Sequence, residues 1–501
     1  MTWPTENTPV ISSKLECPNH DQMVERRKLL AKTVSANYRA LLVLAPPGYG
    51  KTVFLSQLAH NSTKPVIWYT LDPHDDHLPT FNMHLAAAIQ KHIPLDQQEL
   101  ILTTTDPNLQ DSLRHLTSMF VRALEALAEH GALIILDNWQ SISNPRIYSL
   151  ISELISLLPP NIQMVIGGRN SLELPSTLGL HRLYASGELL LITRHDLEIT
   201  EEELGDFFQA RDPNLGPDMQ RKLLRYCMGW PIALSFLTTE DVPPALANYL
   251  EYELLQQESP LIRDFLTKIA VLSRFSASDC QKLLGGDNWE ALLAQLENGQ
   301  LYLSVADDKY QLIPVIRCYL LTTLTENRTE LFQKAGTMAL AQGEFEEALT
   351  CYLEAGDKER ALAVIMEAGA DVLLSGKWRD IGERLEKTFT SAEMRSNPHL
   401  SLLLAIAEIG RGRLGHAQKA VSRAEAIFVD RQDDVGLAQC HLIMARIVRG
   451  WGAVDKSFDL LSHTEERLAP TRFKLLLHIE KSVALYTAGE LKEAKKRLEQ
   501  L

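Results

Sequence analysis

The stretch Leu41–Leu58, which reads LLVLAPPGYGKTVFLSQL, constrains this chain more than any other feature. An apolar run of strand character ends in a Pro/Gly turn, and a helical pattern begins after Lys51 and Thr52. Gly48 and Gly50 let backbone N–H groups turn toward an anion, and the start of a helix adds a favourable dipole. The order of strand, glycine-rich loop and helix predicts an α/β domain that holds a nucleotide phosphate.

Short apolar runs alternate with helical stretches over the first two-fifths of the chain. Runs that are apolar throughout are typical of strands buried on both faces of a parallel sheet. We therefore predict a three-layer α/β domain. The predicted strands are Ala40–Pro46, Pro65–Asp72, Gly131–Asn138, Ile162–Arg169 and Glu188–Arg194, and the helices between them are Thr52–Ala59, Phe81–His92, Asp111–His130 and Pro145–Leu158.

Residue types at the ends of these runs indicate the chemistry of a nucleotide site. Lys51 is expected to neutralise the β- and γ-phosphate oxygens, and the Thr52 hydroxyl to coordinate Mg²⁺. Asp137 closes the buried run ALIIL and is the expected carboxylate on the metal side. Arg169 ends the fourth strand at the same edge of the sheet, so it is a candidate γ-phosphate sensor. Lys51, Asp137 and Arg169 are therefore the candidate catalytic residues.

The residue after Asp137 is Asn138, where many P-loop ATPases carry a second acid. An amide can hold a water molecule but cannot accept its proton, which predicts slow hydrolysis unless Asp72, Asp75 or Asp76 substitutes. The tetrapeptide HDDH at 74–77 is expected to be a solvated loop, because four adjacent residues cannot all converge on one metal ion. Neither a GxSxG nor an HExxH motif is present.

After Arg194 the strand signal fades and helical patterns dominate. Residues 245–324 read as helices followed by two short strands that meet at Asp307-Asp308, which is compatible with a winged-helix domain. From Glu330 onward a glycine phrase recurs at Gly343, Gly376, Gly412, Gly452 and Gly489. Its spacing is close to the ~34 residues of tetratricopeptide repeats, so we predict stacked helix hairpins with each glycine at a turn and an alanine, isoleucine or serine five positions later.

Composition excludes several classes. Net charge is −14, from 50 Lys+Arg against 64 Asp+Glu, which argues against broad contact with nucleic acid. Six scattered cysteines indicate neither a disulfide framework nor a zinc site. Without a signal peptide or a long apolar run, a cytoplasmic location is expected and no membrane partner.

In their order these motifs resemble the signal-transduction ATPases with numerous domains (STAND), specifically the MalT-like branch of LuxR-family transcription regulators. The resemblance rests on VERRKLL (24–30), APPGYGKTVFLSQLA (45–59), WYTLDPHDD (68–76), GGRN (167–170), GWPIAL (229–234), FLTKIAVLSRF (265–275) and LLAQLENGQLYL (292–303). It implies that Arg26 lies near the nucleotide and that Pro231 packs against adenine. The implied nucleotide-binding set is Arg26, Gly48, Tyr49, Gly50, Lys51, Thr52, Val53 and Pro231, with Mg²⁺ at Thr52 and Asp137.

The sequence departs from the family pattern at two motif positions, Asn138 and Ile313. Asn138 replaces the second acid, and Ile313 in YQLIPVI (310–316) replaces a winged-helix histidine that the family is thought to use against bound ADP. An isoleucine cannot donate to a phosphate, so another residue would have to hold the ADP form. Nothing in the sequence matches the family's C-terminal helix-turn-helix domain, and we expect the last repeat to continue in a longer protein.

The expected fold class is a multidomain α/β plus α chain: a P-loop ATPase domain (1–194), a small helical domain (195–244), a winged-helix domain (245–326) and a TPR-like α-solenoid that begins a sensor (327–501). The resemblance implies an ATP/ADP switch that is closed with ADP, and that opens and self-associates when an inducer binds the repeats and ATP replaces ADP. As an enzyme it would be at most a slow ATPase. Two alternatives are a P-loop ATPase or kinase with substrate turnover, and a TPR scaffold with a degenerate nucleotide site.

Overall fold

The computed structural model describes residues 10–19, 23–93, 113–169, 178–209, 211–299, 302–367, 378–465 and 472–498. The chain forms two compact units. The first holds residues 1–266, 274–281 and 285–322, and the second holds 267–273, 282–284 and 323–501. Gly376 and Asn170, two residues of the sequence motifs, lie outside the described ranges.

A five-stranded parallel sheet organises the first part of the chain. Its strands are β1 (Ala40–Leu44), β2 (Val66–Thr70), β3 (Ala132–Asp137), β4 (Ile162–Gly168) and β5 (Leu189–Thr193), in the order β2-β3-β4-β1-β5. All neighbouring pairs are parallel, with Leu44 opposite Gly168 on one side and Thr193 on the other. Each predicted strand is therefore confirmed, and the carboxyl ends of β1, β3 and β4 meet at one edge.

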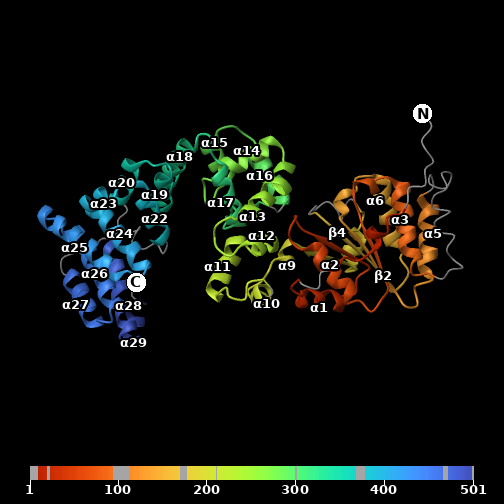
Figure 1. The fold of residues 1–501 in the computed structure, drawn as a ribbon, viewed down its shortest axis with the longest axis horizontal. Helices are drawn as coiled ribbons and strands as arrows, with labels where there is room; N and C mark the ends of the chain where they lie inside the picture. The colour runs from red at the N-terminus through yellow and green to blue at the C-terminus, as the bar shows by residue number, and fades with distance from the viewer. Residues whose placement is uncertain are drawn as a thin grey trace. The chain divides into compact units, whose positions relative to one another are not determined.

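Helices cover both faces of this sheet. Figure 1 shows α3, α5 and α6 grouped together beside it, and these three helices contact one another. Helix α2 instead packs on β3 and β4. The helices of this region are α1 (Arg27–Ser35), α2 (Lys51–His60), α3 (Leu78–Gln90), α5 (Leu113–Glu125), α6 (Pro145–Leu157), α8 (His181–Ser186) and α9 (Arg194–Leu197).

A run of short helices leads into a winged-helix arrangement. The hairpin β6 (Leu303–Ala306) and β7 (Lys309–Leu312) turns at Asp307 and Asp308, whose φ angles of 52° and 58° suit a tight two-residue hairpin turn. This turn is the predicted one. The helices are α10 (Leu204–Gln209), α11 (Pro217–Cys227), α12 (Pro231–Phe236), α13 (Pro244–Tyr249), α14 (Pro260–Ile269), α15 (Ala277–Leu284), α16 (Trp289–Gly299) and α17 (Pro314–Thr323).

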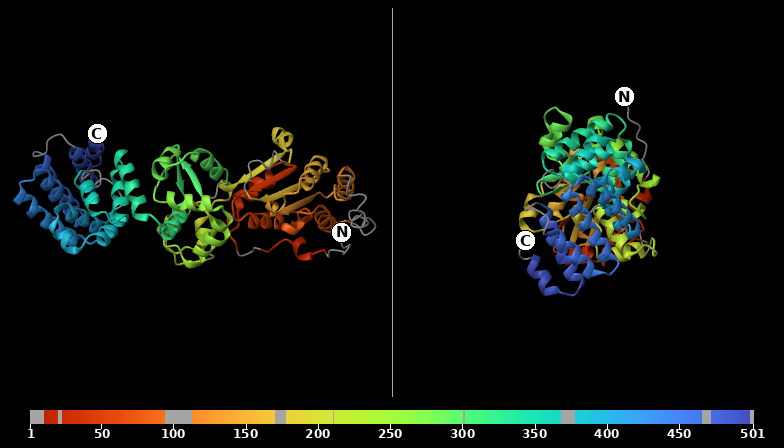
Figure 2. Two further views of the ribbon diagram at one scale, coloured as in Figure 1. Left: turned by 90° about the horizontal axis from the view of Figure 1, so that it is seen from above. Right: turned by 90° about the vertical axis from the view of Figure 1, so that its left-hand side faces the viewer.

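The described residues after α17 form mainly helices, and neighbouring helices pack side by side, as α24 with α25 and α26 with α27 (Figure 2). This confirms the expected fold class of an α/β domain, a winged helix and a solenoid-like helical end. The helices are α18 (Arg328–Ala341), α19 (Phe345–Glu354), α20 (Lys358–Glu367), α22 (Trp378–Thr388), α23 (Ser391–Ser396), α24 (Pro398–Gly410), α25 (Leu414–Arg431), α26 (Asp434–Gly450), α27 (Val454–Glu465), α28 (Arg472–Thr487) and α29 (Leu491–Leu498).

The glycine phrase marks helix-to-helix turns, as predicted. Gly343, Gly412, Gly452 and Gly489 all have φ between 74° and 89°, in the left-handed region that favours glycine after a helix. The small residues five positions later are buried at the contact between helices: Ala348, Ala417, Ser457 and Ala494. A larger side chain at these four positions would push the paired helices apart.

Candidate nucleotide site

The glycine-rich loop connects the central strand β1 to the N-terminus of α2. Gly48 and Gly50 have φ angles of 79° and 77°, so the chain needs glycine's conformational freedom at both positions. Gly50 is the residue that precedes α2, and Phe54 N donates to its carbonyl at 2.9 Å. The unpaired N–H groups of the first turn of α2 therefore start at this loop and can bind an anion.

Lys51 carries a charge that the free protein only partly compensates. Its Nζ donates to the carbonyl oxygens of Ala45 at 2.8 Å and of Pro46 at 3.0 Å. Burial lowers the pKa of the Lys51 amine from 10.5 to about 8, against the attraction of Asp137 and with a further lowering from Arg169. A phosphate bound here would favour the charged amine and reverse this shift.

Thr52 and Asp137 meet where the metal-side carboxylate is predicted. Thr52 Oγ1 donates to Asp137 Oδ2 at 2.7 Å, and Asn138 N donates to Oδ1 of the same carboxylate at 2.9 Å. Asp137 is buried at the end of β3, next to Gly167 of β4. A Cβ at Gly167 would lie 2.5 Å from Leu55 Cδ1 and 3.0 Å from Asp137 Oδ1, so a side chain there would displace Leu55 and crowd the carboxylate.

Asn138 occupies the position of a second acid with an unusual backbone. Its φ of 62° is left-handed, a conformation that asparagine adopts more readily than most residues. The side chain is half-buried, and its Oδ1 accepts from Gln140 Nε2 at 3.3 Å. The structure therefore places an amide, where a second acid would stand, directly after Asp137 and beside its carboxylate.

The three carboxylates that could replace a missing base, those of Asp72, Asp75 and Asp76, each have partners of their own. Lys14 Nζ lies 2.7 Å from Asp72 Oδ2 and 2.8 Å from Asp75 Oδ2. Asp76 accepts from the backbone N of Ser143 and of Asn144, both at 2.8 Å. Asp75 is fully buried, so the expectation of a fully solvated HDDH loop is wrong at this residue, because Lys14 of the N-terminal segment covers it.

The GWPIAL motif lies directly on the P-loop. Ile232 N donates to Gly48 O at 3.1 Å, and Trp230 Nε1 donates to Pro47 O at 3.1 Å. Pro231 therefore sits between two residues that bind the loop, at the first position of α12. Its predicted contact with adenine stays a prediction.

The Tyr49 side chain belongs to the contact between the P-loop and the GWPIAL motif and does not face a nucleotide. Its side chain is fully buried, and its ring lies 6.3 Å from that of Trp230 with an interplanar angle of 27°. Burial, the largest cause, raises the pKa of the Tyr49 hydroxyl well above its usual range. Only the backbone of Tyr49 is available to a nucleotide, and the half-buried Val53 is the third residue of α2.

Arg26 binds protein oxygens. Its guanidinium donates to the carbonyl oxygens of Asp196, Leu197 and Glu198 at 3.1, 2.7 and 2.9 Å, and to Glu203 Oε1 at 3.0 Å. These bonds tie the segment before α1 to the corner after β5. They give Arg26 a structural role that its motif did not predict, and its predicted contact with a nucleotide stays untested.

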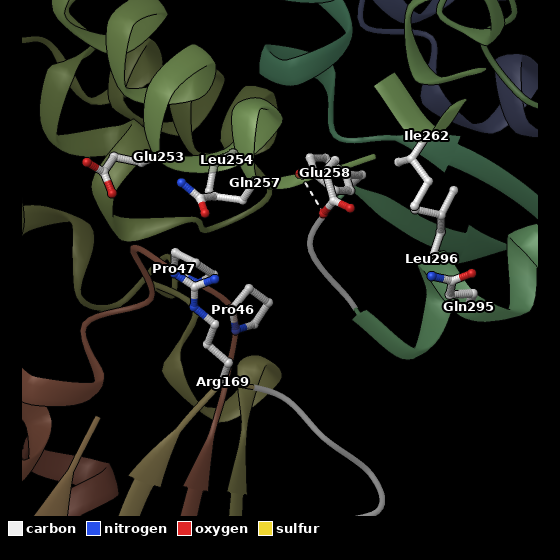
Figure 3. Close-up of a pocket in the computed structure, with 11 residues that line it drawn as sticks. Pro46, Pro47, Arg169, Glu253, Leu254, Gln257, Glu258, Ile262, Gln295 and Leu296 are labelled. Carbon is white, nitrogen blue, oxygen red and sulfur yellow. Dashed lines mark hydrogen bonds between the residues drawn. The ribbon is translucent and has the colours of Figure 1, made fainter. Parts of the chain in front are cut away.

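A cavity of about 230 Å³ opens beside the P-loop. Figure 3 shows Arg169 extending from the end of its strand toward Pro47 and the segment that carries Gln257. Pro46, Pro47 and Arg169 form one side of this cavity, and residues of the winged-helix region form the other: Glu253, Leu254, Gln257, Glu258, Ile262, Gln295, Leu296 and Tyr302. Within it, the Tyr302 hydroxyl donates to Glu258 Oε1 at 3.0 Å.

Ile313, which replaces the family's histidine, is fully buried and its N donates to Tyr302 O at 3.0 Å. The side chain is therefore part of the winged-helix core. Tyr302, on the other end of that hydrogen bond, lines the cavity. The winged-helix region therefore lines the cavity beside the P-loop through Tyr302 and other residues, and Ile313 is not among them.

The loop fits the phosphates of a nucleotide. A Cβ at Gly50 would meet no atom within 4 Å, and Lys51 holds two carbonyl oxygens at distances that phosphate oxygens would take. Thr52 and Asp137 supply the oxygen ligands that Mg²⁺ uses together with phosphates. No cluster of three or more His, Cys, Asp or Glu side chains that could hold a metal ion is found in the described ranges.

Residues 251–332 match the family model of the MalT winged helix domain. This segment is similar to the MalT winged helix. The predicted resemblance to MalT-like STAND proteins is confirmed by this match, and together with the P-loop geometry it supports a nucleotide-dependent regulator in general. The match includes Glu253, Glu258 and Tyr302, so the MalT-type domain supplies much of the cavity wall that faces Arg169.

Two solved structures are similar to parts of this chain. One is a STAND protein with a tetratricopeptide repeat sensor from Pyrococcus horikoshii, with 16% identity, 97% of this chain and 71% of that chain covered, and a TM-score of 0.35. The other is the ORC1 protein of Aeropyrum pernix in complex with DNA, with 15% identity, coverage of 60% and 92%, and a TM-score of 0.29. Both TM-scores lie below 0.5, so neither likeness bears on the arrangement of this chain's parts.

Within the described ranges, no helix is both long enough and apolar enough to cross a lipid bilayer.

The Lys51 amine should make nucleotide binding depend on pH. A bound phosphate favours the protonated amine, so binding above about pH 8 requires the protein to take up a proton. We expect affinity to fall by up to about tenfold per pH unit above that value. Calorimetric titrations at about pH 9 in two buffers should show uptake of close to one proton, and a flat affinity from about pH 7 to 9.5 would contradict the assignment.

The stability of the free protein should depend on pH with the opposite sign to that of nucleotide affinity. Because the folded-state pKa of Lys51 lies below the ordinary 10.5, the unfolded chain binds more protons between about pH 8 and 10.5. The contribution of Lys51 to the free energy of unfolding therefore rises with pH across that window. Saturating nucleotide should abolish this rise.

Proposed function

We propose that this chain is an ATP/ADP-dependent switch of a transcription regulator, closed with ADP and opened by an inducer together with exchange for ATP. The observation that carries the proposal is the shared cavity. Pro46, Pro47 and Arg169 of the nucleotide side form it together with Tyr302 and two glutamates of the winged-helix region. A change in the phosphates at the P-loop would therefore act on the winged helix directly.

The charges in that cavity give a reason for ADP to favour the closed form. Glu253 and Glu258 stand on the side opposite Arg169. An additional γ-phosphate would bring negative charge toward these carboxylates, and like charges at close range repel. Arg169 would be drawn to the added phosphate at the same time. Both effects weaken the hold of the winged helix on the ATP-bound loop.

Mg²⁺ and the nucleotide, when bound, would supply the phosphoanhydride and its charge neutralisation. Lys51 would bind phosphate oxygens, and the Thr52 hydroxyl with Asp137 would hold the ion. Asn138 would position a water molecule without removing its proton, so the nucleotide would persist long enough to act as a state marker. The same amide argues against an enzyme with substrate turnover, and the intact Lys51, Thr52 and Asp137 set argues against an inert scaffold.

The remaining parts of the proposal concern partners. The chain would divide at residues 194, 244 and 326, and the repeats from 327 onward would bind a small-molecule or protein inducer. Self-association would follow in the ATP form. Helix α16 carries Glu290 and Glu297 but no Lys or Arg, so the winged helix would regulate rather than read DNA.

Hydrogen exchange of the full chain tests the switch. With ADP, amides of the β6–β7 hairpin should be protected, and with a non-hydrolysable ATP analogue they should exchange at least about fivefold faster, the lower end of typical coupling between sites. Light scattering on the same samples reports self-association. Equal exchange and equal mass with both nucleotides, each shown to be bound, would refute the proposal.

Asn138→Asp should raise the rate of ATP hydrolysis by about 100-fold, since a positioned base typically contributes that much or more. Single-turnover phosphate release is the measurement. Asn138→Gly is the matched control, because glycine accepts the left-handed φ of 62° and offers no base. A rate for the aspartate variant no higher than for the glycine variant would exclude the assigned position of the water.

A further inference from the structure

Arg194 is a buried cation outside every motif that the nucleotide site uses. It stands where β5 ends and α9 begins, and its side chain is only 3% exposed. A buried guanidinium is costly unless its donors are satisfied and its charge is balanced. Its partners therefore show which parts of the fold it holds together.

Partners of Arg194 within the described ranges include residues from three separate parts of the first unit. Arg194 Nε donates to Glu198 Oε1 at 3.0 Å, within its own corner. Its Nη1 donates to Leu303 O at 3.2 Å, 109 residues away at the start of β6. The guanidinium carbon lies 5.7 Å from the centroid of the Tyr49 ring, a distance at which a cation is attracted to the ring face.

The Tyr49 end of this chain of contacts is rigidly connected to the phosphate-binding backbone. Tyr49 lies between Gly48 and Gly50, and its fully buried ring has no room to turn independently of the loop. Trp230 packs on the same ring and is bound to Pro47 O. A change in loop conformation must therefore move the ring against Arg194.

The Leu303 end is equally well connected to the winged helix. Leu303 pairs with Leu312 across the hairpin, and the next residue, Ile313, donates its N–H to Tyr302 O. Tyr302 lines the cavity beside the P-loop. Arg194 thus binds the carbonyl of Leu303, the residue that directly follows Tyr302 in the chain.

We propose that Arg194 is the positioning residue that couples the conformation of the P-loop, read through Tyr49, to the docking of the β6–β7 hairpin. This inference rests on the proposed switch and names the contact that transmits it. Arg194 touches no nucleotide in this account and acts through Tyr49 and Leu303. The hydrogen bond from Arg194 to Leu303 O would hold the winged-helix hairpin in place of the donor side chain that Ile313 lacks.

The test is the difference in β6–β7 amide exchange between ADP and a non-hydrolysable ATP analogue, measured on the full chain at saturating nucleotide. In Arg194→Met the at least fivefold difference expected of the natural chain should shrink to less than about twofold, while both nucleotides still bind. The Glu198 carboxylate would still have a polar neighbour in this variant, because His195 Nδ1 lies 3.4 Å from Glu198 Oε1. Arg194→Lys keeps the charge but lacks the planar guanidinium that binds Glu198 and Leu303 O together. This variant should therefore restore part of the difference in exchange between the two nucleotides.

Arg211 provides a matched control. Its guanidinium carbon lies 4.8 Å from the Phe207 ring centroid and its Nη1 donates to Ser235 O at 3.1 Å, so it makes the same kinds of contact at an exposed site. Arg211→Met should leave the ADP/ATP difference unchanged. If Arg194→Met does not fold, Tyr49→Leu removes the ring at the other end and should abolish the same difference.

The outcomes separate the two proposals. If the natural chain shows the nucleotide difference and Arg194→Met or Tyr49→Leu keeps it, the coupling role of Arg194 is overturned and the switch stands. If the natural chain shows no difference while binding both nucleotides, the switch fails and the coupling role fails with it. A merely structural role would speed exchange equally with both nucleotides and leave their ratio unchanged, which also overturns the coupling role.

Discussion

Lys51→Ala should lower nucleotide affinity by a factor of about 30 to several thousand while leaving the fold intact. Removing one partner of a buried, hydrogen-bonded charge pair typically costs ~2–5 kcal/mol, and ~1.4 kcal/mol corresponds to a tenfold change. Among the described residues Lys51 Nζ donates to two loop carbonyls, and burial lowers the pKa of its amine, so a bound phosphate would favour the charged form. Calorimetric titration with ADP measures the loss.

Lys64→Ala is the matched control for that loss. Lys64 Nζ also donates to two oxygens, Asn161 O at 3.0 Å and Gln163 Oε1 at 3.1 Å, but it precedes β2 and lies at the opposite edge of the sheet. Its removal should leave the affinity within about twofold, because Lys64 lies at the end of the sheet opposite to the P-loop. Equal affinities for Lys51→Ala and the natural chain would contradict the site as assigned.

Gly48→Ala should separate the GWPIAL motif from the P-loop. A Cβ at Gly48 would lie 2.2 Å from Ile232 Cγ2 and 2.9 Å from Trp230 Nε1, at a φ of 79° that alanine adopts with strain. The strain costs ~1–2 kcal/mol and overpacking ~1–3 kcal/mol. Exchange of the Ile232 amide, which donates to Gly48 O, should accelerate by about 30-fold or more, equivalent to ~2 kcal/mol or above.

Gly50→Ala separates strain from steric clash. Gly50 has nearly the same φ, 77°, but a Cβ there would meet nothing within 4 Å. The variant should therefore carry the backbone strain alone and accelerate exchange of the Ile232 amide much less. If the two alanine variants change that rate equally, the contact between Gly48 and Ile232 has no role in docking the motif.

The features that the sequence predicts well are those that depend on neighbours in the chain. The five strands are continuous apolar runs, the loop glycines need positive φ, and the four repeat glycines that lie in the described ranges each follow a helix. The hairpin at Asp307-Asp308 is local in the same sense. Chain geometry alone places such elements, so their periodicity and turn residues are sufficient to find them.

Contacts between distant residues could not be predicted in this way. Arg194 binds a carbonyl 109 residues away, Trp230 one 183 residues away, and Lys14 covers Asp75 across 61 residues. Arg26 was expected near a nucleotide because of its motif, yet its donors hold the corner at Asp196–Glu198. Nothing in the local pattern distinguishes such a residue from an ordinary surface arginine, and only the tertiary packing assigns its partners.

The measurement that tests the central claim most directly is the nucleotide content of the purified chain. The protein is denatured, and the released nucleotide is identified and quantified by ion-exchange chromatography. A switch at rest, closed over the loop by the winged helix, should release close to one equivalent of ADP. An empty site would contradict the claim that the closed form holds a nucleotide, and one equivalent of ATP would contradict the claim that the resting form is the ADP form.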